Sequence, residues 1–78
     1  MSARCIEHAL AQRDPETILG PLLWLLTRLA RGEADPQASG ELHDALVAHC
    51  TALAAHPGVP ATVRIALGGI AIDHRRYA

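Results

Sequence analysis

Proline, mostly beside aspartate or glycine, divides this chain of 78 residues into four segments. Asp-Pro pairs occur at 14–15 and 35–36, and the tetrapeptide Pro-Gly-Val-Pro occupies 57–60. Proline lacks a backbone N–H, so it is tolerated in the first turn of a helix and disfavoured inside helices and sheets. The segments between these breaks have the length of ordinary helices, which limits the possible folds before any side chain is considered.

The apolar residues favour helices over strands. They are mostly Ala and Leu, which are strong helix formers, whereas Phe is absent and Trp and Tyr occur once each. We therefore predict an all-α fold with a single domain over residues 1–78, a compact bundle of about four helices joined as αα hairpins. A chain this short buries only about 60% of its unfolded surface, so we also expect a homodimer.

Capping signals give the expected helix boundaries. Ser2 can cap a first helix that ends near Gln12, and Asp14-Pro15 begins a second helix that ends at Gly32. Pro21 lies inside this second helix, so we expect a kink or a short break at Gly20-Pro21. The same Asp-Pro signal at 35–36 begins the third helix, with Ser39 as a second candidate cap.

The last two helices each carry one apolar stripe at helical spacing. In the third helix the stripe consists of Leu42, Ala45, Leu46, His49, Cys50 and Leu53. In the fourth helix, which Pro60 opens, it consists of Val63, Ala66, Leu67, Ile70 and Ala71. Gly68-Gly69 belongs to a second stripe with Ile65 and Ile72. Either these glycines let another backbone come close, or the helix breaks there.

Charge and cysteine content restrict the partners and the compartment. The formal net charge is −1, so the basic excess of nucleic-acid-binding proteins is missing. Two cysteines, Cys5 and Cys50, are too few for a disulfide framework, and we predict reduced thiols in a cytoplasmic protein. No apolar run approaches the ~20 residues that cross a bilayer, so we expect no membrane partner. The abundance of Ala, Arg and Gly without Lys indicates a bacterial source.

The segment around the Pro-Gly turn resembles the helix-turn-helix of small bacterial repressors. Ala54 precedes Gly58 by four residues, and Gly58-Val59, Ala61-Thr62-Val63 and Leu67 follow the pattern of that motif. The resemblance implies a DNA-binding regulator, with Thr62, Arg64, Arg75 and Arg76 as the contact residues. The spacing is one residue shorter than in the motif, which rotates later residues by about 100°, and Pro57 ends the preceding helix early. We keep DNA binding as the alternative.

Five histidines make a zinc-stabilised module the second alternative. Cys5 and His8 are three residues apart, and His49 and His56 are seven apart, so each pair can share a helix face. Neither a CxxC nor an HExxH spacing occurs. His49 also fits a half-buried, hydrogen-bonded residue beside Cys50. We therefore predict no metal and no cofactor.

The catalytic patterns of known enzymes are not recognisable. Ser2 and Ser39 are the two serines, and neither lies in a GxSxG turn. His49 and Cys50 are adjacent, so their side chains diverge around the helix and do not form a dyad. We predict no enzymatic activity and no small-molecule substrate.

The segment 21–31 contains more apolar side chains than one core stripe requires. Leu22, Leu25, Leu26 and Leu29 form one stripe, whereas Leu23 and Trp24 point elsewhere. Either Trp24 covers one end of the core, or this second face contacts a partner.

We predict a small non-enzymatic protein that acts by protein–protein interaction, as an adaptor, an inhibitor or anti-activator, or a secretion-type chaperone. Its partner is another protein, a second copy of the chain, or both. The predicted contact residues are Leu19, Leu23, Trp24, Arg28, Arg31, Ile65 and Ile72.

Overall fold

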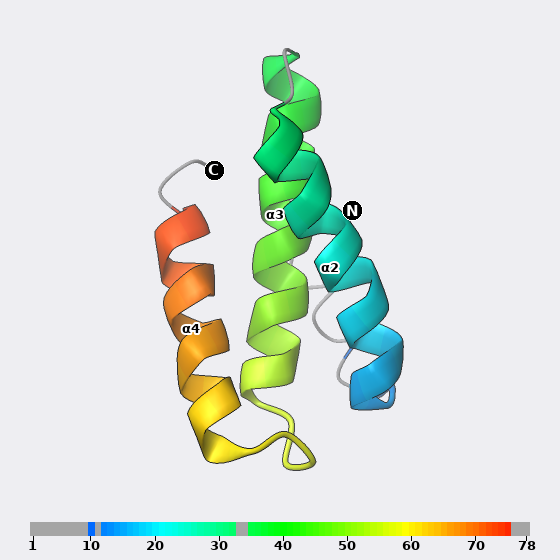
Figure 1. Cartoon of the computed structure of the whole chain (residues 1–78), viewed down its shortest axis with the longest axis vertical. Helices are drawn as coiled ribbons and strands as arrows, with labels where there is room; N and C mark the ends of the chain where they lie inside the picture. The colour runs from blue at the N-terminus through cyan, green and yellow to red at the C-terminus, as the bar shows by residue number, and fades with distance from the viewer. Residues whose placement is uncertain (1–9, 11, 33–34, 76–78) are drawn as a thin grey trace.

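The computed structural model describes residues 10, 12–32 and 35–75 and contains three α-helices (Figure 1). In the labels of Figure 1 they are α2 (Pro15–Arg31), α3 (Pro36–Ala54) and α4 (Ala61–Arg75). Consecutive helices run in opposite directions, with α3 between α2 and α4. The described part of the chain holds no strand, which confirms the all-helical prediction. The predicted first helix, Ser2 to about Gln12, falls almost wholly outside the described residues.

The two Asp-Pro pairs begin helices as expected, but only one aspartate caps through its side chain. Asp35 accepts a hydrogen bond from the Gln37 backbone N–H at 3.2 Å, so Asp35, and not Ser39, is the cap of α3. Asp14 occupies the equivalent position before α2, but its side chain makes no cap hydrogen bond. At the other end of α2, Gly32 adopts a φ of +83°, a backbone conformation that glycine takes without strain.

Neither internal weak point interrupts its helix. The helix α2 continues through Gly20 and Pro21, so the predicted short break at this place is wrong. Proline there removes a single backbone donor, and the flanking turns are held by packing of Ile18 and Leu22 against the core. The helix α4 likewise continues through Gly68-Gly69 to Arg75.

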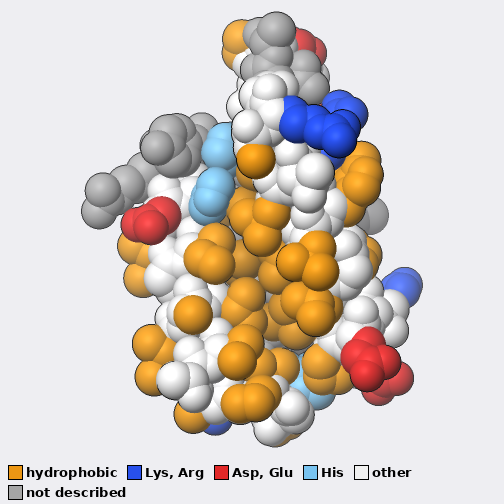
Figure 2. Space-filling view, in the orientation of Figure 1, with side chains coloured by type: hydrophobic (Ala, Val, Ile, Leu, Met, Phe, Trp, Pro, Cys, Tyr) orange, Lys and Arg blue, Asp and Glu red, His pale blue; other side chains and the backbone are white. Residues whose placement is uncertain are grey.

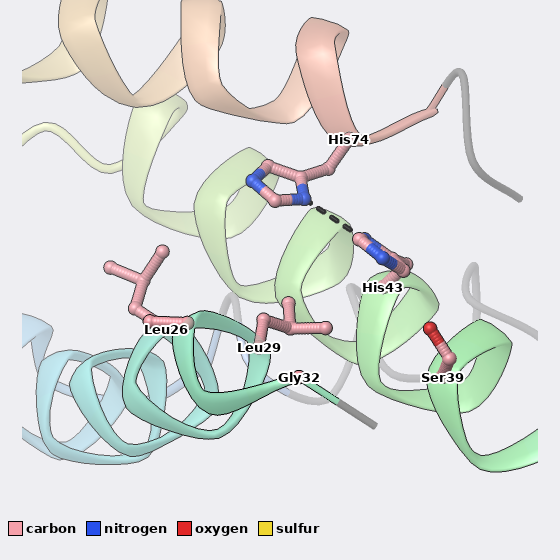
Figure 3. A pocket seen from close by; sticks show the side chains of 7 residues that line it. Leu26, Leu29, Gly32, Ser39, His43 and His74 are labelled. Atoms are coloured by element: carbon pink, nitrogen blue, oxygen red, sulfur yellow. Dashed lines mark hydrogen bonds between the residues drawn. The ribbon is translucent and has the colours of Figure 1, made fainter. Parts of the chain in front are cut away.

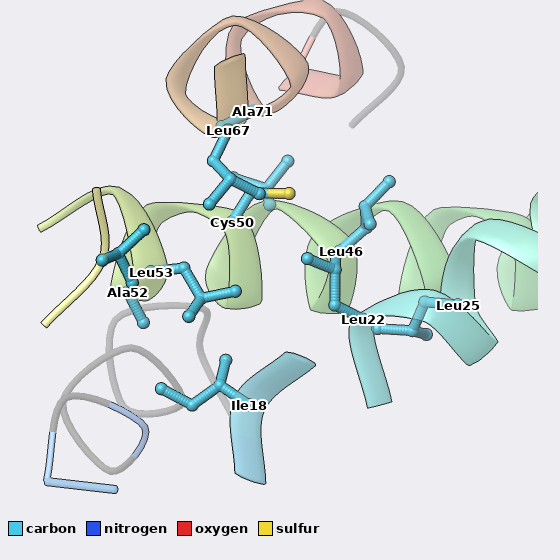
Figure 4. Packing of buried hydrophobic residues seen from close by; sticks show 11 residues of the cluster. Ile18, Leu22, Leu25, Leu46, Cys50, Ala52, Leu53, Leu67 and Ala71 are labelled. Carbon is cyan, nitrogen blue, oxygen red and sulfur yellow. The ribbon is translucent and has the colours of Figure 1, made fainter. Parts of the chain in front are cut away.

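The core is centred on α3, which packs against both other helices (Figure 4). Its predicted stripe is confirmed, with Leu46, Cys50 and Leu53 buried. Because α3 has a neighbour on each side, residues outside that stripe are buried as well, namely Val47, Ala48 and Ala52. The opposing helices contribute Ile18, Leu22 and Leu25 from α2 and Leu67 and Ala71 from α4.

The stripe predicted for α4 is only half correct. Leu67 and Ala71 are buried and Ile70 packs partly against the core, but Val63 and Ala66 are exposed. The reason is that, among the described helices, α4 packs mainly against α3, whereas α2 and α4 make at most marginal contact with each other. The side of α4 that turns toward α2 therefore stays uncovered by the three helices. None of the described helices is both long and apolar enough to cross a membrane.

Candidate functional site

The space between α2 and α4 is bordered by two matching rows of side chains. On α2 the row consists of Leu19, Leu23, Leu26 and Ala30, and on α4 it consists of Val63, Leu67, Ile70 and His74. Both rows have the spacing i, i+4, i+7, i+11, so each row follows one side of its helix. Hydrophobic side chains gather along the middle of the face shown in Figure 2, between α4 and α2.

One end of this space is an apolar hollow of about 210 Å³. It lies where the start of α2, the end of α3 and the start of α4 meet. Its lining residues are Pro15, Glu16, Leu19, Leu53, Gly58, Val59, Pro60, Val63 and Leu67. Glu16 is the one charged residue among them. The hollow is therefore suited to apolar side chains, with a negative charge at its margin.

The turn between α3 and α4 shapes this end. Val59 is buried and packs with the core, and the Gly58 backbone N–H donates a hydrogen bond of 3.0 Å to Nδ1 of His56. A Cβ atom added at Gly58 would lie 3.2 Å from the His56 ring and 3.5 Å from Pro15. The Pro-Gly-Val-Pro turn thus closes tightly against the start of α2.

The other end is a larger hollow of about 450 Å³ (Figure 3). Leu26 and Leu29 of α2 lie on one side, and His43 of α3 and His74 of α4 face each other on the other side. Ser39 adds a hydroxyl near the start of α3. Burial is the main cause that lowers the pKa of His74, the positive charge of His43 lowers it further, and Asp73 opposes both.

The two hollows share no lining residue, and we call them, together with the stretch of α2 and α4 between them, the α2/α4 groove. Its ends are defined by Leu19, Leu53 and Val63, and by Leu26 and His74. Sequence analysis identified Leu19 and Leu23 but missed Val63, because the stripe in α4 was assigned to the core. The matching i, i+4, i+7, i+11 rows in α2 and α4 are the signal that could have indicated it.

The predicted contact residues are distributed over three surfaces. Leu19 lines the groove, and Leu23 lies one turn further along the same side of α2, 55% exposed. Trp24, 58% exposed, is turned about 100° from Leu23 around the helix. The Arg28 guanidinium lies over its ring at 5.5 Å from the ring centroid, a cation–π contact, and Arg31 is exposed on the same flank.

The remaining two predicted residues lie on the outer side of α4. Ile65 is 76% and Ile72 58% exposed, the former being the most exposed large apolar side chain of the described chain. They are rotated by about half a turn from Val63. A Cβ atom added at Gly68 or Gly69 between them would meet nothing within 4 Å, so no backbone of the described chain approaches these glycines.

The residues of the DNA-binding alternative do not form one exposed basic surface. Thr62 is exposed, whereas Nε of Arg64 is buried and has no hydrogen-bond partner among the described residues. Arg75 donates a hydrogen bond to the Thr51 hydroxyl of α3 at 3.4 Å, and Arg76 lies outside the described residues. The helices α3 and α4 run antiparallel side by side, whereas helix-turn-helix pairs cross at about 90–120°.

Of the two candidate metal pairs, the structure describes His49 and His56, and these two side chains make separate hydrogen bonds. His49 is half-buried and donates from Nδ1 to the Ala45 carbonyl at 2.6 Å, as sequence analysis anticipated, and His56 lies in the turn. Cys5 and His8 lie outside the described residues. Burial raises the pKa of the Cys50 thiol to about 11. No group of three or more His, Cys, Asp or Glu residues in the described chain is arranged to hold a metal ion.

Comparison of the chain with models of known protein families, with curated proteins and with solved structures gave no significant match. The fold places the chain in a general class, the small all-helical proteins with an antiparallel α3–α4 hairpin.

Proposed function

We propose that this chain is a non-enzymatic binding protein whose α2/α4 groove receives an amphipathic helix of a partner protein. The observation that carries this proposal is the apolar end of the groove, where exposed Leu19 and Val63 face a hollow over buried Leu53. Exposed apolar surface of this kind is typical of protein interfaces, and helix-in-groove binding is a recurring form of recognition.

The arrangement of the three helices supports a helix as the occupant. The helices α2 and α4 both pack on α3 and hardly touch each other. In an antiparallel four-helix bundle, a fourth helix packs in the place opposite α3 and contacts both flanking helices. A partner helix there would contact Leu19 and Leu23 on one side and Val63 on the other.

Charge gives the partner helix a further property. Glu16 is the one charged residue among those lining the apolar hollow, and no positive group lines it. We therefore expect a partner helix with a Leu-rich or Ile-rich face and a Lys or Arg residue near the end that contacts Glu16. An acidic residue at that place would be repelled.

Site-specific photocrosslinking tests this proposal. A benzoylphenylalanine replacing Leu19 probes the groove, and the same group replacing exposed Thr17, on the opposite side of α2, is the matched control. We expect the probe at 19 to capture a defined protein from the source cells, with the crosslinked peptide being an amphipathic helix, and the probe at 17 not to capture it. A crosslinked peptide from this chain itself, or equal capture from both positions, would contradict the proposal.

A separate surface supports the proposed homodimer. The outer stripe of α4 reads Ile65, Gly68, Gly69, Ile72, which is the same in both directions, and its isoleucines are exposed. A two-fold axis between the glycines would place Ile65 of one copy beside Ile72 of the other in an antiparallel helix pair, an isologous contact. Sedimentation equilibrium should show a dimer that Ile65→Ser weakens and Thr17→Ser does not. If the wild-type protein is monomeric, the proposed homodimer is excluded.

The other roles proposed from the sequence remain open to direct tests. An adaptor, an inhibitor and a secretion-type chaperone differ in what the bound partner does, and assays of the captured partner with and without this chain distinguish them. For a DNA-binding regulator, binding would weaken steeply from low to moderate salt. Microscopy of a tagged chain in bacterial cells would test the cytoplasmic location.

A further inference from the structure

Two histidines from different helices face each other beside the hollow lined by Leu26 and Leu29 (Figure 3). The Nδ1 atoms of His43 and His74 lie 2.9 Å apart, and the ring centroids are separated by 5.0 Å with 33° between the ring planes. The residues are 31 positions apart in the sequence. The pair is therefore created by the antiparallel packing of α3 and α4 and not by a short spacing in the sequence.

The two Nδ1 atoms share one proton in a hydrogen bond, and imidazole nitrogens are good metal ligands. When both rings are neutral, one Nδ1–H donates and the other Nδ1 accepts. A metal ion can bond to both Nδ1 atoms when the donor ring changes to the tautomer that carries its proton on Nε2, so both rings stay neutral and no proton is lost overall. With metal–nitrogen distances of about 2.0–2.1 Å, two ligands of a tetrahedral ion are about 3.3–3.4 Å apart, so the rings would separate by roughly half an ångström.

We propose that His43 and His74 bind a late first-row transition-metal ion, such as Zn²⁺, through their Nδ1 atoms. Imidazole suits Zn²⁺, Ni²⁺ and Cu²⁺, and affinity for such ligands rises toward Cu²⁺. Within the described residues these two histidines are the proposed ligands, and water can take further coordination positions. The hollow of about 450 Å³ beside the pair has room for water, and the Ser39 hydroxyl also lines it.

Such an ion would connect the first half of α3 to the last turn of α4. Both ligands are held on helices, so the two rings are close together before the metal arrives and need only a small shift to bind it, and their proximity is lost when the chain unfolds. Binding to the folded state alone raises the unfolding temperature in proportion to the logarithm of metal concentration. The site lies on the groove but is independent of its occupant, so it can be tested whether or not the proposed partner exists.

The experiment uses chelator-treated chain with Cys5→Ser and His8→Gln, because these two residues could bind metal on their own. Calorimetric titration with Zn²⁺ and Ni²⁺ should give one ion per chain. His43→Gln and His74→Gln should each weaken binding by about tenfold or more, and the matched control His56→Gln should not. Circular dichroism verifies that each variant is helical.

A second measurement needs no change in the pair. Long-range ¹H–¹⁵N NMR spectra of the same Cys5→Ser, His8→Gln chain report each ring nitrogen separately, and added Zn²⁺ should shift Nδ1 of His43 and His74 before any other histidine nitrogen. If neither Zn²⁺ nor Ni²⁺ binds to the chain even when the metal is in excess, the proposal is overturned. It is also overturned by binding that first shifts His49 or His56, or that is unchanged in both pair variants.

Discussion

Leu46 and Leu23 are the same residue type on neighbouring helices, yet one is 0% and the other 55% exposed. Leu46 lies on α3, which has a helix on each side, whereas Leu23 lies on a side of α2 that faces no described helix. The difference is therefore made by the arrangement of helices and not by local sequence. It separates the apolar residues that stabilise the fold from those that stay exposed.

The largest expected effect is the difference in free energy of unfolding between variants at Leu46 and at Leu23. Leu46→Ala should lower the free energy of unfolding by about 2–5 kcal/mol, because it removes a fully packed side chain and leaves a cavity. Leu23→Ala should change it by no more than about 0.5 kcal/mol, as for other exposed positions. Urea unfolding followed by circular dichroism measures both. Similar losses would mean that Leu23 is covered in the isolated chain.

The glycines sharpen the contrast between a strained and an open backbone position. Gly32→Ala should destabilise the protein by about 1–2 kcal/mol, because φ is +83° and the added Cβ is unfavourable in that conformation. Gly69→Ala, inside α4 with open space around it, should stabilise by about 0.5–1 kcal/mol. Thermal unfolding of the dilute, monomeric chain shows the two signs directly, and a loss of stability for Gly69→Ala there would contradict the open position. At concentrations where the chain dimerises, a loss for Gly69→Ala would be expected from the proposed helix pair.

The two Asp-Pro starts differ by one hydrogen bond, and removing each aspartate measures it. Asp35→Ala should cost about 1 kcal/mol, because the Gln37 N–H loses its partner. Asp14→Ala should cost about 0.3 kcal/mol, since only its charge near the helix start is lost. Chemical unfolding of the two variants should rank them in this order, and the reverse order would contradict the cap assignment.

The smallest effect concerns pH. The folded-state pKa of His74 lies below its ordinary value of 6.5, so its contribution to stability is present above pH 6.5 and is lost as the pH falls through the lower, folded value. In chelator, the wild type should therefore lose stability below pH 6.5 faster than His74→Gln. Unfolding midpoints at several pH values measure the slopes, and equal slopes would exclude the burial of His74.

The helix class, the starts at Asp14 and Asp35 and the stripe of α3 follow from the sequence, because capping and periodicity are local properties. Three findings do not. Pro21 fails to break α2, because tertiary packing of Ile18 and Leu22 outweighs one lost donor. Val63 is exposed, because periodicity does not tell which apolar side has a neighbour.

The His43–His74 pair is the third. Its members are far apart in the sequence, so no local spacing predicts their contact, and the candidate metal pairs taken from local spacing, Cys5/His8 and His49/His56, do not include them. The candidate contact residues likewise separate onto three surfaces once α2 and α4 are placed, since Leu23 and Trp24, adjacent in sequence, are turned about 100° apart.

The most direct test of the central claim, that the α2/α4 groove binds a partner helix, is a methyl NMR titration. A synthetic peptide of the helix captured through position 19 is added to the chain labelled at its Leu, Val and Ile methyl groups. We expect the signals of Leu19, Leu23 and Val63 to shift with saturation while those of Ile65 and Ile72 do not. Shifts confined to Ile65 and Ile72, with Leu19 and Val63 unchanged, would show that the outer side of α4 is the binding surface and that the groove is not.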